Sequence, residues 1–183
     1  DPVGSEIIWT VTATDVYGET GLGTDSATVT NSAPTVDTVT VTPESGQVGD
    51  ILTCSATASD EDDDEPTITY AWSDGSEGET YTISDADPVG SEIVCTATAT
   101  DVYGETGIGT DSATVTNTAP VMGTVTISPD PAYNDDTLVC SATATDADGT
   151  EPTITYEWTG GATGSELPLS SIIAASGDTL TCT

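Results

Sequence analysis

Apolar or small residues alternate with threonine and serine over several stretches of the chain. One stretch runs from Ile51 to Ala58, a second from Glu92 to Ala99, and a third, residues 67–72, ends on Trp72. A period of two residues is typical of a β-strand that buries one face, and helical periodicity is absent from the sequence. The pattern therefore predicts an all-β fold.

The same alternation places the strands in the middle of the chain. We expect strands at residues 35–42, 51–59, 67–73, 80–83, 92–101 and 111–117, and a short further strand between Asp74 and Gly78. If Cys54 and Cys95 face inward from two of these strands, their sulfurs meet in the core, and Trp72 can pack against the bridge. Such an arrangement is a two-sheet sandwich that is pinned at its centre.

The order Cys54, Trp72, Cys95 resembles the immunoglobulin-like sandwich, in which cysteines on strands B and F flank a tryptophan on strand C. Residues 72–76 and 98–116 are similar to the related PKD-type repeats of microbial surface proteins. These resemblances imply tandem immunoglobulin-like β-sandwich domains with intradomain B–F disulfides. The residues that they assign to disulfides and cores are Cys54, Cys95, Cys140 and Cys182, with Trp72 and Trp158.

The chain also repeats itself at a fixed offset. Residues 1–7 (Asp-Pro-Val-Gly-Ser-Glu-Ile) recur at 87–93, so the offset is 87 − 1 = 86 residues. A period of this size fits one small domain, and the chain is therefore interpreted as a window on a tandem array. We expect the end of one repeat at 1–31, a complete repeat at 35–117 and the start of a third at 121–183.

The two incomplete repeats leave two interpretations open. We favour the interpretation that the sequence covers only part of a longer repetitive chain. In the alternative, neighbouring chains add strands to the two incomplete sandwiches and complete them. The joints at 31–34 and 117–120 are short and end in proline. Such joints leave little room for a flexible linker and favour an extended rod.

Trp9 interrupts the cysteine pattern. It stands where the later repeats have Cys95 and Cys182. We expect Trp9 to be a core residue that fills the volume of the missing disulfide, since an indole is a plausible volume substitute. The alternative is an unpaired thiol upstream of the chain.

The composition narrows the classes of function. The chain has 32 acidic residues and no Lys, Arg or His, which gives a formal charge of −32. Nucleic acid needs a basic surface, so it is excluded as a direct partner, and so is electrostatic attachment to an anionic membrane. Imidazole, amine and guanidinium chemistry is also excluded. A carboxylate pair of the glycosidase kind remains conceivable, but the acids concentrate in turns, and we expect no enzyme.

The four cysteines indicate the compartment. Phe is absent and Met occurs once, so a small sandwich would have a thin core of Ala, Val, Thr and Ile. Four cysteines at matched positions in such a chain suggest disulfides and an oxidising environment, outside the cell or on its surface.

Two acidic loops are candidates for binding calcium. Residues 60–65 read Asp-Glu-Asp-Asp-Asp-Glu, and their counterpart, 146–151, reads Asp-Ala-Asp-Gly-Thr-Glu. Several carboxylates in one tight loop offer the hard oxygens that calcium selects. In this topology Asp101 or Asp15, together with the joint residue Asn31 or Asn117, can approach the loop; the alternative is a solvated loop without an ion. The candidate ligands are Asp60, Asp62, Asp64, Asp101, Asp146, Asp148 and Glu151.

These features favour a structural role. We expect the shaft of a surface fibre, filament or adhesin, with neighbouring repeats or copies of itself as partners. One alternative is a carbohydrate-binding or adhesive module for a glycan or cell-surface target, in which Tyr17 and Tyr103 stack on sugar rings instead of packing within the protein. Another is an accessory repeat segment of a secreted enzyme.

Overall fold

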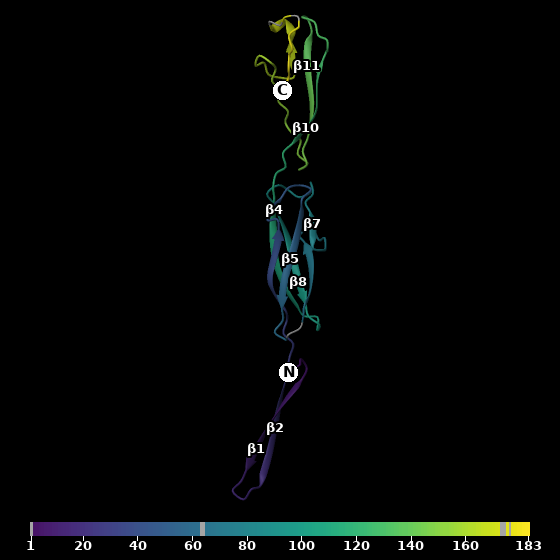
Figure 1. The fold of residues 1–183 in the computed structure, drawn as a ribbon. Helices are drawn as coiled ribbons and strands as arrows, with labels where there is room; N and C mark the ends of the chain where they lie inside the picture. Colours follow the sequence, from purple (N-terminus) through teal and green to yellow (C-terminus); the bar gives the residue numbers. More distant parts are fainter. Residues whose placement is uncertain (1, 63–64, 173–174, 176) are drawn as a thin grey trace. The chain divides into compact units, whose positions relative to one another are not determined.

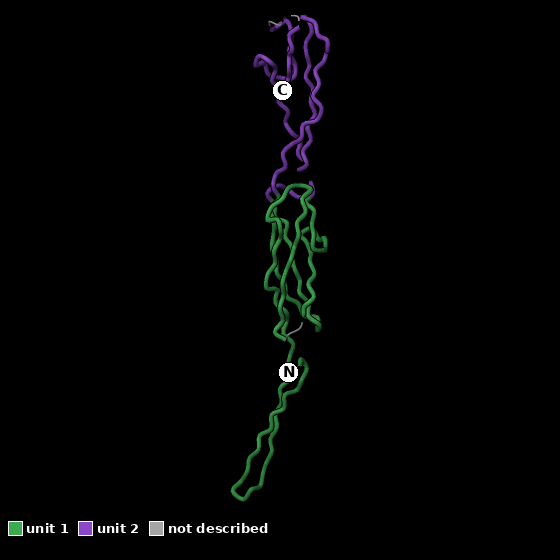
Figure 2. The backbone as a smooth tube through the Cα atoms, viewed as in Figure 1, with its two compact units in different colours: residues 1–83, 91–115 green, residues 84–90, 116–183 purple. Residues whose placement is uncertain are grey.

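Strands make up nearly all of the regular structure in the computed structural model, which describes residues 2–62, 65–172, 175 and 177–183. The chain forms two compact units, residues 1–83 with 91–115 and residues 84–90 with 116–183 (Figure 2). Within the described residues, the only helix is the 3-10 turn η1 (Leu169–Ser171), and no helix is long and apolar enough to cross a membrane. The predicted all-β fold is confirmed, whereas the predicted division into three repeats stays a prediction.

The first unit begins with a hairpin of β1 (Glu6–Thr14) and β2 (Thr20–Thr28), which pair antiparallel (Figure 1). Every residue of both strands is exposed, because the described part of the chain packs no second sheet on either face. Trp9 is 71% exposed and lies opposite Asp25. The prediction that Trp9 is a core residue stays a prediction, because a two-stranded ribbon alone has no facing layer that could bury an indole.

The other strands of the first unit form two sheets. One has the order β3–β5–β7, and the other has the order β4–β9–β8–β6, in which β4 and β9 run parallel. All the remaining neighbours in these two sheets are antiparallel. The strands are β3 (Thr35–Thr42), β4 (Ser45–Gly46), β5 (Ile51–Ser59), β6 (Thr67–Trp72), β7 (Thr80–Thr82), β8 (Glu92–Thr100) and β9 (Thr106–Val115).

Both sheets contribute side chains to one hydrophobic core. Leu52 and Cys54 enter it from β5, Ile93 and Cys95 enter it from β8, and all four are at most 4% exposed. The alternate residues of β8 are buried in turn, as the period of two predicts. The core therefore lies between strands that are far apart in the sequence.

The start of β9 differs from the prediction. The strand begins at Thr106, five residues before the expected position 111. Gly107 and Gly109 weaken the alternating pattern in this stretch. A Cβ atom at Gly109 would lie 2.8 Å from methyl carbons of Val36 and Val39, and one at Gly107 would collide with the carbonyl oxygen of Pro34. Glycine is needed here because β3 and the residue before it pass directly over β9.

The predicted short strand between Asp74 and Gly78 is replaced by a turn. The Gly75 amide donates to the Trp72 carbonyl over 2.9 Å, and the Trp72 amide donates to Ser76 over 2.8 Å. Gly75 and Gly78 have φ angles of 90° and 117°, which glycine adopts without strain. These hydrogen bonds turn the chain back on itself, so that β6 ends at Trp72 and a single bridge pairs Ala71 with Glu77.

The second unit contains one sheet of three antiparallel strands. It consists of β10 (Val121–Ser128), β11 (Thr137–Thr145) and β12 (Glu166–Pro168), in the order β10–β11–β12. Its buried core is small and consists of Leu138, Cys140, Trp158 and Leu167. The unit therefore has a hydrophobic core of its own.

Candidate functional site

A disulfide joins the two sheets of the first unit at the centre of the core. Cys54 of β5 and Cys95 of β8 form this bond, with their Cα atoms 6.4 Å apart. Trp72 is 3% exposed and lies against Tyr81, with a distance of 5.4 Å between ring centroids. The Trp72 Nε1–H donates to the Gly78 carbonyl over 2.9 Å, so the buried indole keeps its hydrogen bond.

The second unit has the same arrangement at positions 86 or 87 residues later. Cys140 and Cys182 form its disulfide, with Cα atoms 6.5 Å apart. Trp158 is 2% exposed, and its Nε1–H donates to the Gly164 carbonyl over 2.7 Å. The structure thus buries both predicted core tryptophans beside a disulfide.

Asp101 is the centre of a polar cluster that follows β8. Its Oδ1 accepts hydrogen bonds from the backbone amides of Tyr103 and Glu105, at 2.9 and 2.8 Å. Its Oδ2 accepts from Asn31 Nδ2 at 2.7 Å, and the same amide group also donates to Glu105 Oε2 at 3.2 Å. Asp101 is only 7% exposed, so its charge is stabilised by amide donors instead of by water.

The joint continues this cluster into the acidic loop after β5. The backbone amide of Ser32 donates to Asp62 Oδ2 over 2.6 Å, and the amide of Asp62 donates to Asp60 Oδ1 over 2.8 Å. Asp62 and Asp101 are therefore each hydrogen-bonded to one of the residues 31–32, whereas Asp60 is hydrogen-bonded to the amide of Asp62. That these carboxylates bind calcium stays a prediction. Asp64, also predicted as a ligand, lies outside the described residues.

The electrostatics of the cluster follow from these contacts. The hydrogen bond from Asn31 lowers the pKa of Asp101 below its ordinary value of 3.8; burial opposes this shift, and backbone amides reinforce it. Two oxygens of the cluster, Asn31 Oδ1 and Asp60 Oδ2, are buried and have no hydrogen-bond partner. Across the described residues, no three Asp, Glu, Cys or His side chains are grouped so that they could hold a metal ion by themselves.

The second acidic loop repeats part of this geometry. The amide of Thr118 donates to Asp148 Oδ2 over 2.7 Å, the Thr118 hydroxyl donates to Oδ1 over 3.1 Å, and the amide of Asp148 donates to Asp146 Oδ1 over 2.9 Å. Glu151, the third predicted ligand of this loop, is exposed.

Sequence reasoning missed two members of the first cluster. Glu105 shares the Asn31 amide with Asp101, and Ser32 supplies the backbone donor for Asp62. A signal for Glu105 was present in the sequence, because Glu19 follows Asp15 at the same spacing as Glu105 follows Asp101. Ser32 acts through its backbone amide, which every residue type except proline has, so the sequence carried no signal for it.

The tyrosines of the two loops after β1 and β8 are exposed. Tyr17 is 90% exposed and Tyr103 is 55% exposed, and the preceding residues, Val16 and Val102, are 93% and 71% exposed. Each loop therefore offers an apolar and aromatic tip to the solvent.

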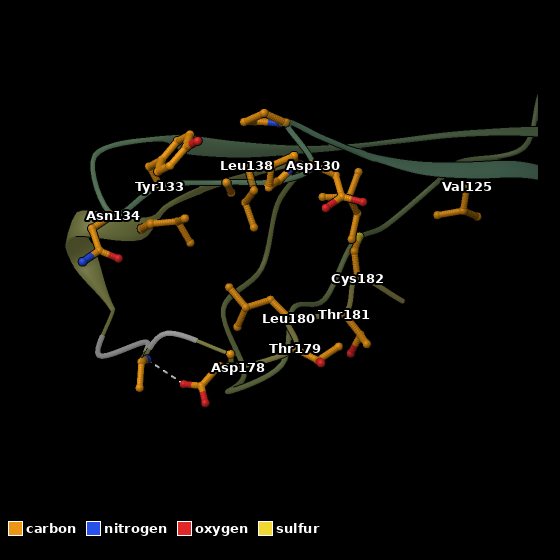
Figure 3. A pocket seen from close by; sticks show the side chains of 17 residues that line it. Val125, Asp130, Tyr133, Asn134, Leu138, Asp178, Thr179, Leu180, Thr181 and Cys182 are labelled. Atoms are coloured by element: carbon orange, nitrogen blue, oxygen red, sulfur yellow. Dashed lines mark hydrogen bonds between the residues drawn. The ribbon is translucent and has the colours of Figure 1, made fainter.

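A cavity of about 1040 Å³ lies in the second unit beside its disulfide (Figure 3). Its lining includes Leu138, Leu180 and Cys182.

The fold and its two cores define an all-β, disulfide-linked protein. No known protein-family model matches the chain, and no curated protein matches it. The chain is similar to a solved chain of a 1.5-MDa bacterial ice-binding adhesin described for its retention on the host cell surface, with 16% identity and a TM-score of 0.31. The match covers 91% of this chain and 64% of that chain, so this chain spans less than two thirds of the solved chain.

Proposed function

We propose that the chain is part of an extracellular tandem array of immunoglobulin-like β-sandwich repeats that forms the shaft of a surface fibre, filament or adhesin and has no enzymatic activity. The observation that carries this proposal is the recurrence of one core. A disulfide and a hydrogen-bonded tryptophan occur twice, with the tryptophans 158 − 72 = 86 residues apart. When the same core recurs at a constant spacing along a chain, similar domains can follow one another and lengthen the protein.

The connections within the first unit support a role under tension. The disulfide ties a strand of one sheet to a strand of the other, so the sheets cannot separate while it is intact. Strands β4 and β9 run parallel. Along the chain, β4 lies on the N-terminal side of the core strands and β9 on their C-terminal side. Tension on the two chain ends therefore slides β4 and β9 in opposite directions along their length, and the hydrogen bonds between them resist together.

The chemistry of the chain suits an extracellular location. Two disulfides form stably in an oxidising compartment. The absence of Lys and Arg leaves no cleavage site for trypsin-like proteases. The charge of −32 keeps the chain soluble and repels other acidic surfaces.

The proposal is tested by changing the number of repeats in the producing cells. Deletion of residues 35–120 removes 120 − 35 + 1 = 86 residues, which is one period. Immunogold electron microscopy of intact cells is expected to show labelled surface fibres that are shorter by one repeat. Deletion of half a period, residues 35–77, is the control. It should abolish the fibres, because the remaining strands of the repeat cannot form a complete hydrophobic core. Fibres of unchanged length after the first deletion, or label confined to the cytoplasm, would contradict the proposal.

The exposed loop tips favour a second function, an adhesive module that binds glycans. An exposed tyrosine can stack on a sugar ring, and Tyr103 is held on a loop that Asp101 orders through backbone hydrogen bonds. A glycan array that binds the chain and loses its signal with Tyr103→Ala would support this function. Absence of binding to any glycan would leave the shaft as the better description.

A further inference from the structure

Two hairpins of the chain are nearly identical in sequence but differ in burial. Residues 1–34 and 87–120 differ at five positions, so 34 − 5 = 29 are identical. The pairing of β1 with β2 has the same register as that of β8 with β9, shifted by 92 − 6 = 86 residues. Every residue of β1 and β2 is nevertheless exposed, whereas β8 and β9 contribute to the core of the first unit. Hairpins this similar would compete for one core unless particular side chains distinguish them.

Most of what the core receives from β8 and β9 is also present on β1 and β2. Ile93, Ala113 and Val115 are each at most 4% exposed. The backbone amide of Val41 in β3 donates to Asp111 Oδ2 over 2.7 Å, so β9 also supplies an acceptor to the other sheet. Identical residues stand at the corresponding positions of the first hairpin, namely Ile7, Asp25, Ala27 and Val29. These residues therefore do not decide which hairpin completes the core.

The two largest differences fall on buried positions. Trp9 corresponds to Cys95, and Val11 corresponds to Ala97. Cys95 and Ala97 are both 0% exposed, and protein interiors are packed too closely to accept larger side chains without strain. The other three differences exchange similar side chains: Ile8 for Val94, Leu22 for Ile108 and Ser32 for Thr118. We propose that Trp9 and Val11 exclude the hairpin β1–β2 from the core of the first unit, so that only β8–β9 completes it.

Trp9 would meet two obstacles at the position of Cys95. Cys95 lies opposite Trp72 of β6, and directly opposite residues of an antiparallel pair have Cβ atoms about 4.5–5.5 Å apart. An indole there would face the Trp72 indole, which is 3% exposed and fixed by its hydrogen bond to Gly78. It would also replace the sulfur that binds Cys54 in the facing sheet. The exchange therefore adds volume at the centre of the core and removes the bond between the sheets.

Val11 would disturb a second contact between the sheets. The corresponding Ala97 lies opposite Tyr70 of β6. The Tyr70 hydroxyl accepts a hydrogen bond from the Ala56 amide of β5 over 3.1 Å, and Tyr70 packs against the core. Valine adds two methyl groups at a position that is fully buried, so it would push the Tyr70 ring away from Ala56. The small size of Ala97 is therefore matched to the tyrosine opposite it.

The inference goes beyond the proposed function, because it concerns the choice between two hairpins of one chain and not what an array of repeats does. Trp9 and Val11 leave the hairpin itself intact, since β1 pairs with β2 along nine residues. They act only on the choice of the sheet that covers it. A chain with near-identical repeats needs such a distinction, because exchange of equivalent elements is a characteristic way for repeat proteins to misassemble.

The first experiment places the side chains of the excluded hairpin in the core. In the full 183-residue chain, Cys95→Trp/Ala97→Val gives β8–β9 the inward residues of β1–β2. Cys95→Ala is the matched control, because it removes the disulfide without adding volume. Differential scanning calorimetry should show the first unit of Cys95→Trp/Ala97→Val melting at least about 4 °C below that of Cys95→Ala. The second unit, which neither variant changes, is the internal reference.

The second experiment transposes the two hairpins. Trp9→Cys/Val11→Ala/Cys95→Trp/Ala97→Val moves the small residues to β1–β2 and the large ones to β8–β9. The chain is unfolded, reduced and refolded with oxidised and reduced glutathione, so that oxidised glutathione accepts the two electrons of each new disulfide. Free thiols are then blocked, and the protein is cleaved after glutamate and analysed by mass spectrometry. We expect most Cys54 to be bonded to the thiol introduced at position 9, within one chain or between two.

A control variant tests whether the inward face of β1 is required. In it, Ile8→Cys replaces Trp9→Cys, and the other three substitutions are kept. Residue 8 lies on the opposite face of β1 from residue 9, because successive side chains of a strand alternate. The introduced thiol therefore points away from the core when the hairpin docks, and most Cys54 should stay unbonded.

Three results would overturn the proposal. Equal melting of Cys95→Trp/Ala97→Val and Cys95→Ala would show that the core accommodates the indole and the valine. A Cys54 thiol that stays free in the fourfold variant, although Cys140 and Cys182 are bonded, would show that β1–β2 is excluded for another reason. Equal bonding of Cys54 in the control variant would show that any thiol near residue 9 is sufficient. None of these results changes the fibre length by which the proposed function is tested.

Discussion

Reduction of the Cys54–Cys95 disulfide is expected to increase the length that the first unit releases when it unfolds under force. The two cysteines are 41 residues apart, and the bond carries the force past the segment between them. While the bond is intact, tension cannot reach β6, β7 or the loops between β5 and β8, because all of them lie inside the closed loop. The bond should therefore limit extension as well as stabilise the fold.

The size of the effect follows from the geometry. An extended chain spans about 3.3–3.6 Å per residue, so the 41-residue segment adds roughly 135–148 Å when it is freed. The bonded Cα atoms are already 6.4 Å apart, which leaves a net gain of roughly 130–140 Å. In the chain-entropy model, closing a loop of this length also stabilises the domain by about 4 kcal/mol, a large share of a small domain's stability.

Single-molecule force spectroscopy measures this length directly. The chain is pulled between handles at its two ends, first oxidised and then in reducing agent, and Cys54→Ala/Cys95→Ala is the matched variant that lacks the bond. The longer release should appear in reducing agent and in the double variant under both conditions, together with a lower unfolding force. An oxidised wild-type protein that already releases the full length would refute the reasoning, since the bond would not then lie on the path of the force.

Three further predictions concern stability, each read from denaturant or thermal unfolding. Trp72→Ala should lower the free energy of unfolding by about 3–5 kcal/mol, because the indole is buried. Trp9→Ala, at a site that is 71% exposed, should change it by no more than about 0.5 kcal/mol. Equal effects of the two substitutions would contradict the assigned core. Gly109→Ala should lower the free energy of unfolding by about 1–3 kcal/mol, because the added Cβ overlaps with two valines of β3. The control is Gly23→Ala at the equivalent position, which should leave stability unchanged because no atom lies within 4 Å of the added Cβ. An unchanged stability of Gly109→Ala would rule out the close approach of β3 and β9. Because the folded pKa of Asp101 is lowered, its carboxylate stabilises the metal-free fold above the ordinary value of 3.8 and stops doing so as the pH falls below that value. The stability difference between wild type and Asp101→Asn should therefore shrink on acidification below pH 3.8, and a difference independent of pH would exclude the ionised form as its source.

Local patterns predicted the strands well. β3 and β5 have the predicted bounds, and β6, β7 and β8 end one residue earlier than expected. An alternation of apolar and polar residues records which face of a strand is buried, and this record is local. The predicted disulfides also formed. Cys54, Cys95 and Cys140 lie on the buried faces of β5, β8 and β11, as the alternation predicts.

The pattern along a strand does not decide burial where burial depends on a second layer. Trp9 sits in the same alternating pattern as Cys95, yet Cys95 is fully buried and Trp9 is exposed. The pattern shows on which face of the strand a residue lies, but burial requires a second sheet that covers this face. The hairpin of β1 and β2 has no such sheet among the described residues. Gly107 and Gly109 similarly look like strand breakers until β3 is seen to cross them.

By itself, the sequence determined the strand content, the inward parity of the cysteines, the repeat offset and the lack of any basic side chain. Only the tertiary structure decided which inward faces are covered, that Asn31 and not Asn117 donates to Asp101, and that Asn31 Oδ1 and Asp60 Oδ2 are buried without a hydrogen-bond partner. The physical reason is that alternation and charge belong to neighbouring residues, whereas burial and satisfaction of polar atoms depend on segments that meet after folding.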